Sequence, residues 1–391
     1  MMSTVSFALG SDVLFDRRLL AGRTVGLVCN PASIDARFTH VLDRAAAGGV
    51  TVGAIFGPQH GVRSDVQENM IESAHGRDER RRVPVYSLYS ETREPTAEML
   101  AGLDALVVDL QDVGTRIYTY IYTMANCLRA ARTHGLPVVV CDRPNPIGGR
   151  LVEGPMLDPG FESFVGQFPI PMRHGMTIGE LARLFNETFG IGAKLEVVAM
   201  QGWSRTDDFD RTPLPWVPPS PNLPTIESAI VYPGTVLFEG TNVSEGRGTT
   251  KPFELVGAPW VNDADVFAAA LNARRLPGVY FRPAMFEPTF HKHAGTACGG
   301  CQIHVTDREA FRPVETGVAL VAAFHHADPD RFRWRDPPYE YEYVRPPIDI
   351  LYGSTRLRDA VTAGGDVTLA RAWPEEIAPF LTLRDRFLLY A

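Results

Sequence analysis

Five short, continuously apolar runs recur through the first 150 residues, and they constrain the fold more than any other feature. They read TVGLVCN, VTVGAIFG, VPVYSLY, LDALVVDL and LPVVVCD, at 24–30, 50–57, 83–89, 103–110 and 136–142. A run without polar alternation is typical of a strand buried on both faces, as in a parallel sheet covered by helices. Helical segments are expected between these strands, near 36–47, 94–101 and 117–134. The alternation predicts an α/β fold with a Rossmann-like, doubly wound, mostly parallel sheet.

The rest of the chain has more widely spaced elements. We expect an amphipathic helix at 177–189, where Thr177 and Glu180 have the spacing of a capping box. A strand at 195–200 and a Pro-rich crossover, LPWVPPSPNLPT at 214–225, follow it. Beyond the Gly-rich segment FEGTNVSEGRGTTKPFE, the pattern predicts a smaller α+β domain with helices at 264–274, 312–326 and 375–390 and strands at 279–286 and 302–306.

The length of the chain favours two domains. A chain of 391 residues exceeds the roughly 250–300 residues at which a single core stops growing. We expect a Rossmann-like N-terminal domain at 1–233 and the smaller α+β domain at 234–391.

Composition and charge exclude several classes of protein. The chain has 38 basic and 46 acidic residues, a net charge of −8, and no run of Lys or Arg that would form a nucleic-acid-binding patch. No stretch approaches the roughly 18 consecutive apolar residues of a transmembrane helix. We do not expect a secretory signal at the N-terminus, because no basic region precedes an apolar core there. The five cysteines are an odd number, which fits a reducing compartment. We therefore expect a cytoplasmic protein with no nucleic-acid or membrane partner.

Several familiar cofactor and catalytic motifs are missing from the sequence. No G-x-G-x-x-G follows the first apolar run, so a dinucleotide cofactor is not expected. The P-loop, H-E-x-x-H and G-x-S-x-G patterns are absent too. The pattern H-x-H-x4-C-x2-C at 291–301 has donors that suit tetrahedral zinc, but it also fits a loop with packed cysteines, and we prefer the second interpretation. We expect neither a metal nor an organic cofactor.

An unusual polar turn follows most of the expected strands. These turns read NPAS, GPQHG, DLQDVGTR and DRPNPIGG. Ligands of open α/β sheets bind at the carboxyl ends of the strands. Pro and Gly alone would only end a strand, whereas His60, Arg116 and Arg143 add groups that a plain turn does not need. The turns therefore predict one binding site along this edge.

The chain resembles the NamZ-type exo-β-N-acetylmuramidases from about Val25 to past Asp307. The resemblance lies in the stretches VGLVCNPAS, FGPQHGVRSDVQENM, DLQDVGTRIYTYIYTM, DRPNPIGG, EGP, YPGTVLFEGTNVSEGRGTTKPFE and HAGTACGGCQIHVTD. It implies a Rossmann-like N-terminal domain, a smaller C-terminal domain and an active site in the cleft between them. It also implies release of β-linked N-acetylmuramic acid from the non-reducing end of peptidoglycan fragments, and so an amino-sugar or muropeptide substrate.

Glycoside hydrolysis needs two groups at the scissile bond. A carboxylic acid protonates the leaving oxygen, and a second group attacks or stabilises the anomeric carbon. With an N-acetyl sugar, the substrate's own acetamide can be the nucleophile, oriented by a carboxylate. Acidic residues follow the expected strands or lie in the Gly-rich segment: Asp65, Glu68, Glu72, Asp109, Asp112, Glu239 and Glu245. Of these, Glu72, Asp112 and Glu245 are our catalytic candidates, together with Gln59 and His60.

The sequence departs from the family pattern at Gln59. Characterised members read P-E-H-G, and the resemblance implies that their glutamate is the acid/base; this chain has Gln59 followed by His60. An amide cannot transfer a proton at neutral pH, and acid/base catalysis is worth roughly 10²–10⁴-fold. Glu72 or Glu68, in a helix expected at QENMIES, supplies the proton, or His60 does, or the protein binds amino sugars without efficient cleavage. We favour a working hydrolase, because the other family segments are intact.

Recognition of N-acetylmuramic acid calls for a cation, because this sugar carries a lactyl carboxylate. Arg247 in the Gly-rich segment is the first candidate, with Arg116 and Arg63 behind it. Alternatively, Arg247 only holds Glu245 across the domain interface.

The sugar hydroxyls require further polar partners. Amide, hydroxyl and carboxylate groups that can serve are those of Asn242, Asn145, Ser244 and Asp112. The tyrosines at 118, 120 and 122 cannot share one face of a helix, so we expect one of them to stack on a sugar ring and the others to be core residues.

Overall fold

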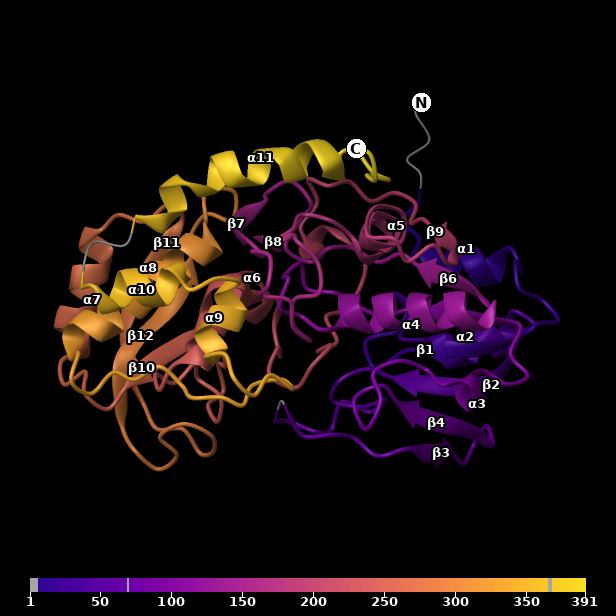
Figure 1. The fold of residues 1–391 in the computed structure, drawn as a ribbon, viewed down its shortest axis with the longest axis horizontal. Coiled ribbons are helices and arrows are strands. Elements are labelled where there is room, and N and C mark those ends of the chain that lie inside the picture. Colours follow the sequence, from indigo (N-terminus) through magenta and orange to yellow (C-terminus); the bar gives the residue numbers. More distant parts are fainter. Residues whose placement is uncertain (1–5, 69, 365–367) are drawn as a thin grey trace.

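The computed structural model describes residues 6–68, 70–364 and 368–391, and its first part is built on a seven-stranded sheet of order β3-β4-β2-β1-β5-β6-β9 (Figure 1). Edge strand β3 pairs antiparallel with β4, and the other neighbours pair in parallel. The predicted α/β class and mostly parallel sheet are confirmed. The strands are β1 (Thr24–Val28), β2 (Thr51–Gly57), β3 (Gly76–Asp78), β4 (Val83–Ser87), β5 (Ala105–Val108), β6 (Pro137–Cys141) and β9 (Lys194–Val198).

Helices cover both faces of this sheet. Those of the first part are α1 (Gly10–Asp16), α2 (Val41–Ala47), α3 (Ala97–Leu100), α4 (Tyr120–His134) and α5 (Ile178–Thr188). Helices α1 and α2 pack together against one face, and α4 and α5 pack together against the other. Val25 and Leu27 of β1 belong to one core cluster and Val28 to the other. Both faces are therefore buried, which explains why the runs show no polar alternation.

The expected helices differ from the observed ones mainly at their N-terminal ends. The segments predicted near 36–47 and 94–101 are shorter than expected, and the one at 117–134 begins at Tyr120 and ends before Gly135, which has φ 75°. The capping box is confirmed: Thr177 N–H donates to Glu180 Oε2 (3.0 Å), and Glu180 N–H donates to Thr177 Oγ1 (3.3 Å). The helix expected at QENMIES is wrong over residues 67–68 and 70–73, and Asn69 lies outside the described residues.

The second part, which runs from residue 226 to the end of the chain, contains a three-stranded antiparallel sheet of order β10-β12-β11. Its strands are β10 (Leu255–Ala258), β11 (Val279–Phe286) and β12 (Cys298–Val305). The helices of this part are α6 (Ile226–Thr235), α7 (Ala264–Ala273), α8 (Pro313–Ala327), α9 (Pro347–Tyr352), α10 (Arg356–Thr362) and α11 (Trp373–Arg384). Short 3-10 turns lie at η1 (Phe209–Arg211), η2 (Val236–Gly240) and η3 (Leu369–Arg371), and a separate pair of strands is β7 (Glu153–Met156) with β8 (Pro171–Arg173).

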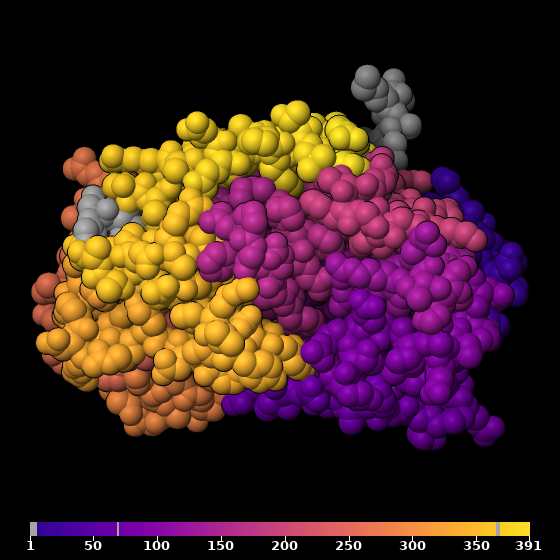
Figure 2. Space-filling view, viewed as in Figure 1, coloured from indigo at the N-terminus to yellow at the C-terminus, as the bar shows by residue number. Residues whose placement is uncertain are grey.

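The C-terminal segment joins the two parts. Helix α11 lies along the top of the molecule and leads back towards the first part (Figures 1 and 2). Beyond it, the Tyr390 hydroxyl donates to Asp142 Oδ2 (2.6 Å), and Arg205 N–H donates to the Ala391 carbonyl (3.0 Å). A domain boundary at 233/234 stays a prediction.

None of the described helices is both long enough and apolar enough to cross a lipid bilayer.

Candidate active site

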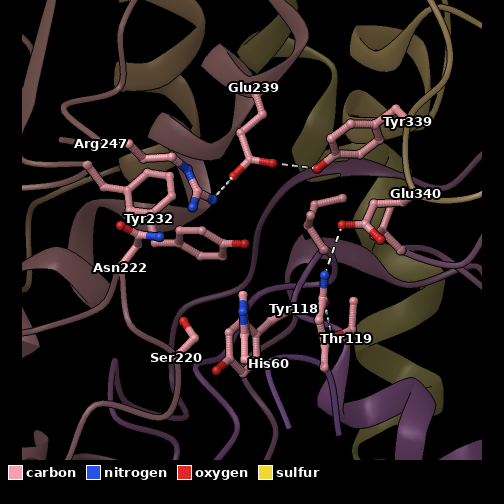
Figure 3. A pocket seen from close by; sticks show the side chains of 14 residues that line it. His60, Tyr118, Thr119, Ser220, Asn222, Tyr232, Glu239, Arg247, Tyr339 and Glu340 are labelled. Atoms are coloured by element: carbon pink, nitrogen blue, oxygen red, sulfur yellow. Dashed lines mark hydrogen bonds and ion pairs between the residues drawn. The ribbon is translucent and has the colours of Figure 1, made fainter. Parts of the chain in front are cut away.

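A pocket of about 430 Å³ is lined by residues from both parts of the molecule (Figure 3). The first part contributes residues after β2, before α4 and in the Pro-rich crossover, and the second part contributes residues from η2, the Gly-rich segment and the turn after 338. The polar lining residues are Gln59, His60, Tyr118, Thr119, Ser220, Asn222, Tyr232, Glu239, Arg247, Tyr339 and Glu340.

Gln59 and Glu340 meet at one side of this pocket. Gln59 Nε2 donates to Glu340 Oε1 (2.9 Å), and the Tyr89 hydroxyl donates to Glu340 Oε2 (2.7 Å). Thr119 Oγ1 donates to Gln59 Oε1 (2.8 Å), which fixes the amide so that its N–H groups point at the carboxyl. Glu340 is only 3% exposed. Burial raises its pKa to about 7, despite the two hydrogen bonds that favour the charged form.

A tight turn places Glu340 in the pocket. Tyr339 and Glu342 exchange two backbone hydrogen bonds (2.8 and 2.9 Å), so Glu340 and Tyr341 are the two central residues of the turn. Their φ angles are 45° and 67°. Both values lie in the left-handed region that Gly, Asn and Asp usually fill in such turns. A Glu-Tyr pair is therefore held here at a conformational cost of about 1–2 kcal/mol per residue.

Contacts of Tyr341 secure this turn against the first part of the molecule. Its ring lies 5.5 Å from that of Tyr89 and 5.6 Å from that of Phe164, in edge-to-face geometry, and the Arg93 guanidinium stacks 3.7 Å from its centroid. Its hydroxyl donates to Glu72 Oε1 (3.1 Å). These contacts position the neighbouring carboxyl across the boundary between the parts.

Glu239 is the second carboxylate of the pocket. Arg247 Nη2 donates to its Oε1 (2.6 Å), and the Tyr339 hydroxyl donates to its Oε2 (2.6 Å). Arg247 Nε also lies 3.2 Å from Glu245 Oε1, and Lys292 Nζ lies 2.7 Å from Glu245 Oε2. Although burial alone would raise it, Lys292, His291 and Arg247 lower the pKa of Glu245 to about 2. Glu245 is therefore a fixed anion behind the pocket wall.

His60 contributes a neutral imidazole. Its Nδ1 lies 2.7 Å from the Val66 carbonyl oxygen, which can only accept, so Nδ1 carries the ring proton. Burial lowers the pKa of His60 to about 4, more than the Val66 carbonyl raises it. At neutral pH the imidazole is uncharged, and its Nε2 is an acceptor rather than a source of protons.

The Pro-rich crossover forms another wall of the pocket. Its Pro219 carbonyl accepts hydrogen bonds from Asn30 Nδ2 (2.8 Å) and from the Tyr120 hydroxyl (2.5 Å). Asn222 Nδ2 donates to the Gln67 carbonyl (2.9 Å). These contacts hold Ser220 and Asn222 beside the residues that follow β2, at the carboxyl ends of the strands.

Comparison with known proteins gives a consistent result over the whole chain. Residues 25–227 match the family model "Exo-beta-N-acetylmuramidase NamZ, N-terminal", and residues 230–390 match "Exo-beta-N-acetylmuramidase NamZ, C-terminal". The chain belongs to the NamZ family. It is 47% identical over 385 residues to the peptidoglycan beta-N-acetylmuramidase NamZ of Bacillus subtilis (strain 168), covering 97% of this chain and 91% of that protein.

Two crystal structures of DUF1343 family proteins from Bacteroides fragilis NCTC 9343 are similar to this NamZ-family chain. One is 34% identical with a TM-score of 0.88, and the other is 27% identical with a TM-score of 0.76. Each similarity covers 99% of both chains. The fold is therefore shared from end to end.

Of the site residues predicted from the sequence, Gln59, His60 and Arg247 line the pocket of this NamZ-family chain. Glu245 lies behind Arg247, whose Nε lies 3.2 Å from Glu245 Oε1, and this is the contact on which the alternative interpretation of Arg247 depends. The exposed Arg63 and Glu72 lie along a separate surface hollow. The catalytic and substrate-binding roles of these residues stay predictions.

The remaining predicted residues lie in places other than the pocket lining. Arg116 is fully buried and donates to the carbonyls of Pro155, Ile170, Leu351 and Tyr352, at 2.8–3.1 Å. The other side chains stabilise turns: Asp112 accepts from Gly114 N–H, Asn145 from Ile147 N–H, Asn242 from Arg333 N–H and Ser244 from Gly246 N–H. The expectation that every polar turn faces one site overlooked this local demand for hydrogen bonds.

The expectation that the three tyrosines point apart within one helix is wrong for Tyr118 and Tyr120, because Tyr118 precedes α4 and its ring lies 4.6 Å from that of Tyr120. Tyr118 lines the pocket, Tyr120 binds the Pro219 carbonyl, and the Tyr122 hydroxyl donates to the Arg116 carbonyl (2.7 Å).

The His-Cys pattern at 291–301 takes part in other contacts. His293 Nε2 lies 2.6 Å from the Asn242 carbonyl oxygen, Cys298 Sγ lies 3.5 Å from that of Thr296, and Cys301 is in the core. Over the described parts of the chain, no three His, Cys, Asp or Glu side chains are grouped to hold a metal ion.

Sequence reasoning missed several lining residues of this NamZ-family site, above all Glu340. The signal that could have found it is the segment YEYEY at 339–343, between the proline pairs at 337–338 and 346–347. Alternating tyrosine and glutamate in a short segment bracketed by prolines is unusual for a surface loop. Asn222 lies in the Pro-rich crossover, for which the sequence predicts only a connecting role.

Proposed function

We propose that this chain is an exo-acting β-N-acetylmuramidase that releases β-linked N-acetylmuramic acid from the non-reducing end of peptidoglycan fragments. The observation that carries the proposal is a pocket, lined by both parts of a NamZ-family chain, that holds a protonatable carboxyl, Glu340, and a carboxylate, Glu239. Glycosidases use such a pair around the scissile bond. The substrate is a small amino sugar or muropeptide.

The alternative, a binding protein without turnover, is not favoured. A chain that is 47% identical over 97% of its length to a protein named as a peptidoglycan beta-N-acetylmuramidase is expected to share its reaction class. Gln59 was the reason for the alternative, and the pocket holds another carboxyl within hydrogen-bond distance of it.

The deciding experiment is release of 4-nitrophenol from its β-N-acetylmuramide, with the β-N-acetylglucosaminide run alongside. We expect turnover of the muramide and little turnover of the glucosaminide. Tight binding of N-acetylmuramic acid by calorimetry without turnover would instead support the binding protein.

We propose that Arg247 binds the lactyl carboxylate of the substrate. It is a buried cation in the lining whose guanidinium is already oriented by Glu239.

A cytoplasmic location is proposed as well, supported by five free, buried cysteines.

A further inference from the structure

We propose that Glu340 is the group that protonates the glycosidic oxygen, in place of the glutamate that the family resemblance implies at position 59. The inference rests on the proposed function and names the proton donor that the sequence left open.

The candidates named from the sequence do not fit this role. Glu72 is exposed, lies outside the pocket lining and accepts a hydrogen bond from Tyr341. Glu68 is exposed and outside the lining as well. His60 lines the pocket, but it is neutral and its ring proton is committed to the Val66 carbonyl.

The position of Glu340 fits the role on three counts. Its carboxyl lines the pocket and contacts the Gln59 side chain, so it occupies the same side of the pocket as the residue it would replace. The left-handed φ angles of Glu340 and Tyr341 indicate a turn held under strain, and such strain clusters at functional sites. Burial keeps a fraction of this carboxyl protonated near neutral pH, which a proton donor needs.

Gln59 then has a positioning role. Thr119 fixes its oxygen, and its amide N–H holds Glu340 Oε1. The groups that shift the pKa of Glu340 include Tyr89, Glu239 and Arg247. Electrostatic interactions also connect Glu340 with the hydroxyls of three further tyrosines: Tyr232, Tyr339 and Tyr341. Glu239 raises the pKa of Glu340 and Arg247 lowers it. These two effects partly cancel, so burial is the main cause of the raised pKa.

The proton balance of the step is simple. The O–H bond of the Glu340 carboxyl breaks as its proton passes to the glycosidic oxygen. The electron pair of the C1–O bond leaves with that oxygen, which departs as the alcohol of the next sugar. A water molecule then supplies the hydroxyl at C1 and returns one proton to the Glu340 carboxylate.

The test compares two substrates with different leaving groups. The β-1,4 disaccharide of N-acetylmuramic acid and N-acetylglucosamine needs a proton on its leaving oxygen, whereas 4-nitrophenolate leaves without one. For Glu340→Gln, we expect kcat/KM on the disaccharide to fall by roughly 10²–10⁴-fold, with a much smaller loss on the 4-nitrophenyl muramide. A purely structural role would lower both values equally and would overturn the proposal.

Two further variants keep the result interpretable. Glu342→Gln is the matched control, because it removes a carboxylate that belongs to the same turn but lies outside the pocket lining. It should leave kcat/KM on both substrates unchanged. The double variant Gln59→Glu/Glu340→Gln moves the carboxyl to the facing position and should recover disaccharide hydrolysis in part. This recovery also shows that the Glu340→Gln site folds.

The possible failures are distinguishable. A wild-type protein that hydrolyses neither muramide overturns the proposed function and this inference together. A wild-type protein that hydrolyses the disaccharide, with Glu340→Gln within a few-fold of it, overturns the inference alone.

Discussion

In the contact between Gln59 and Glu340, an amide that is not itself acidic holds the carboxyl group that we propose as the proton donor. The amide donates to the carboxyl at 2.9 Å and is fixed by Thr119 on its other side. If two carboxyls stood at this distance they would share a proton, because like charges so close cannot both ionise. Gln59 avoids that conflict and leaves Glu340 as one well-defined acid.

Gln59→Glu tests this reading. We expect no large gain in activity on the disaccharide at neutral pH, because the acid is already present at Glu340. The new carboxyl would raise the pKa of the pair, so the fall of kcat/KM with rising pH, near pH 7 in the wild type, would move to higher pH. The measurement is kcat/KM from about pH 5 to 9 for both proteins. A gain of 100-fold or more at pH 7 would show that the wild type lacks its acid.

At the scale of elements, the Pro-rich crossover acts as a structural wall rather than a linker. It crosses the carboxyl ends of the strands and is held by hydrogen bonds from Asn30 and Tyr120 to the Pro219 carbonyl. Proline-rich chain cannot use ladder hydrogen bonds, so side chains from the sheet turns and α4 supply them. The conformation of residues 214–225 therefore depends on the first part of the molecule.

Removal of one hydroxyl should loosen this wall. Tyr120→Phe deletes the hydrogen bond to Pro219 in a buried site, so we expect a loss of about 1–2 kcal/mol in the free energy of unfolding. KM should rise, because Ser220 and Asn222 line the pocket. Urea unfolding and steady-state kinetics measure the two effects. The control is Tyr280→Phe, which alters an exposed ring (51% exposed) and should change neither value; equal effects in both variants would contradict the argument.

At the scale of the whole molecule, one buried cation joins the two parts. The Arg116 guanidinium donates to the carbonyls of Pro155 and Ile170. It also donates to the carbonyls of Leu351 and Tyr352, which belong to the second part. Burial lowers its pKa to about 10, which still leaves it charged at neutral pH. Because the four oxygens would otherwise lose their partner, we expect the two parts to unfold together.

Buried carboxyls should make stability depend on pH. Burial raises the pKa of Glu153 to about 7, against about 4.3 in an unfolded chain. The folded state therefore keeps a proton that the unfolded state releases, and stability falls as pH rises from about 4.3 to about 7. Glu153→Gln keeps the acceptor for Glu315 N–H and should remove up to roughly 4 kcal/mol of this fall.

The measurement is the free energy of unfolding of the wild type and of Glu153→Gln at pH 4.5 to 8. The matched control is Glu309→Gln, a carboxylate with 81% of its side chain exposed, which should follow the wild-type curve. Parallel curves for wild type and Glu153→Gln would contradict the shift. Asp142 and Glu340, whose pKa values burial also raises to about 7, leave a residual slope in both proteins.

The sequence predicted the sheet well because burial on both faces leaves a local mark, the unbroken apolar runs such as that at 24–30. It predicted His60 as a site residue because it follows a strand, Gln59 because of the family resemblance, and Arg247 because of the chemistry of the substrate that this resemblance implies. It could not predict Glu340, because its place depends on a turn 281 residues away from Gln59. It also misread Arg116, since a cation bound only by backbone carbonyls has no partner pattern in the sequence.

The meeting of positions 59 and 340 also affects how uncharacterised members of such a family should be sorted. An alignment is usually inspected column by column, and a survey that requires the tetrapeptide P-E-H-G would set this chain aside as a degenerate copy. The side chains of the residues in these two columns, 59 and 340, are in direct hydrogen-bond contact. A survey that scores them jointly, and asks for an acidic residue at either, would keep such chains among the enzymes.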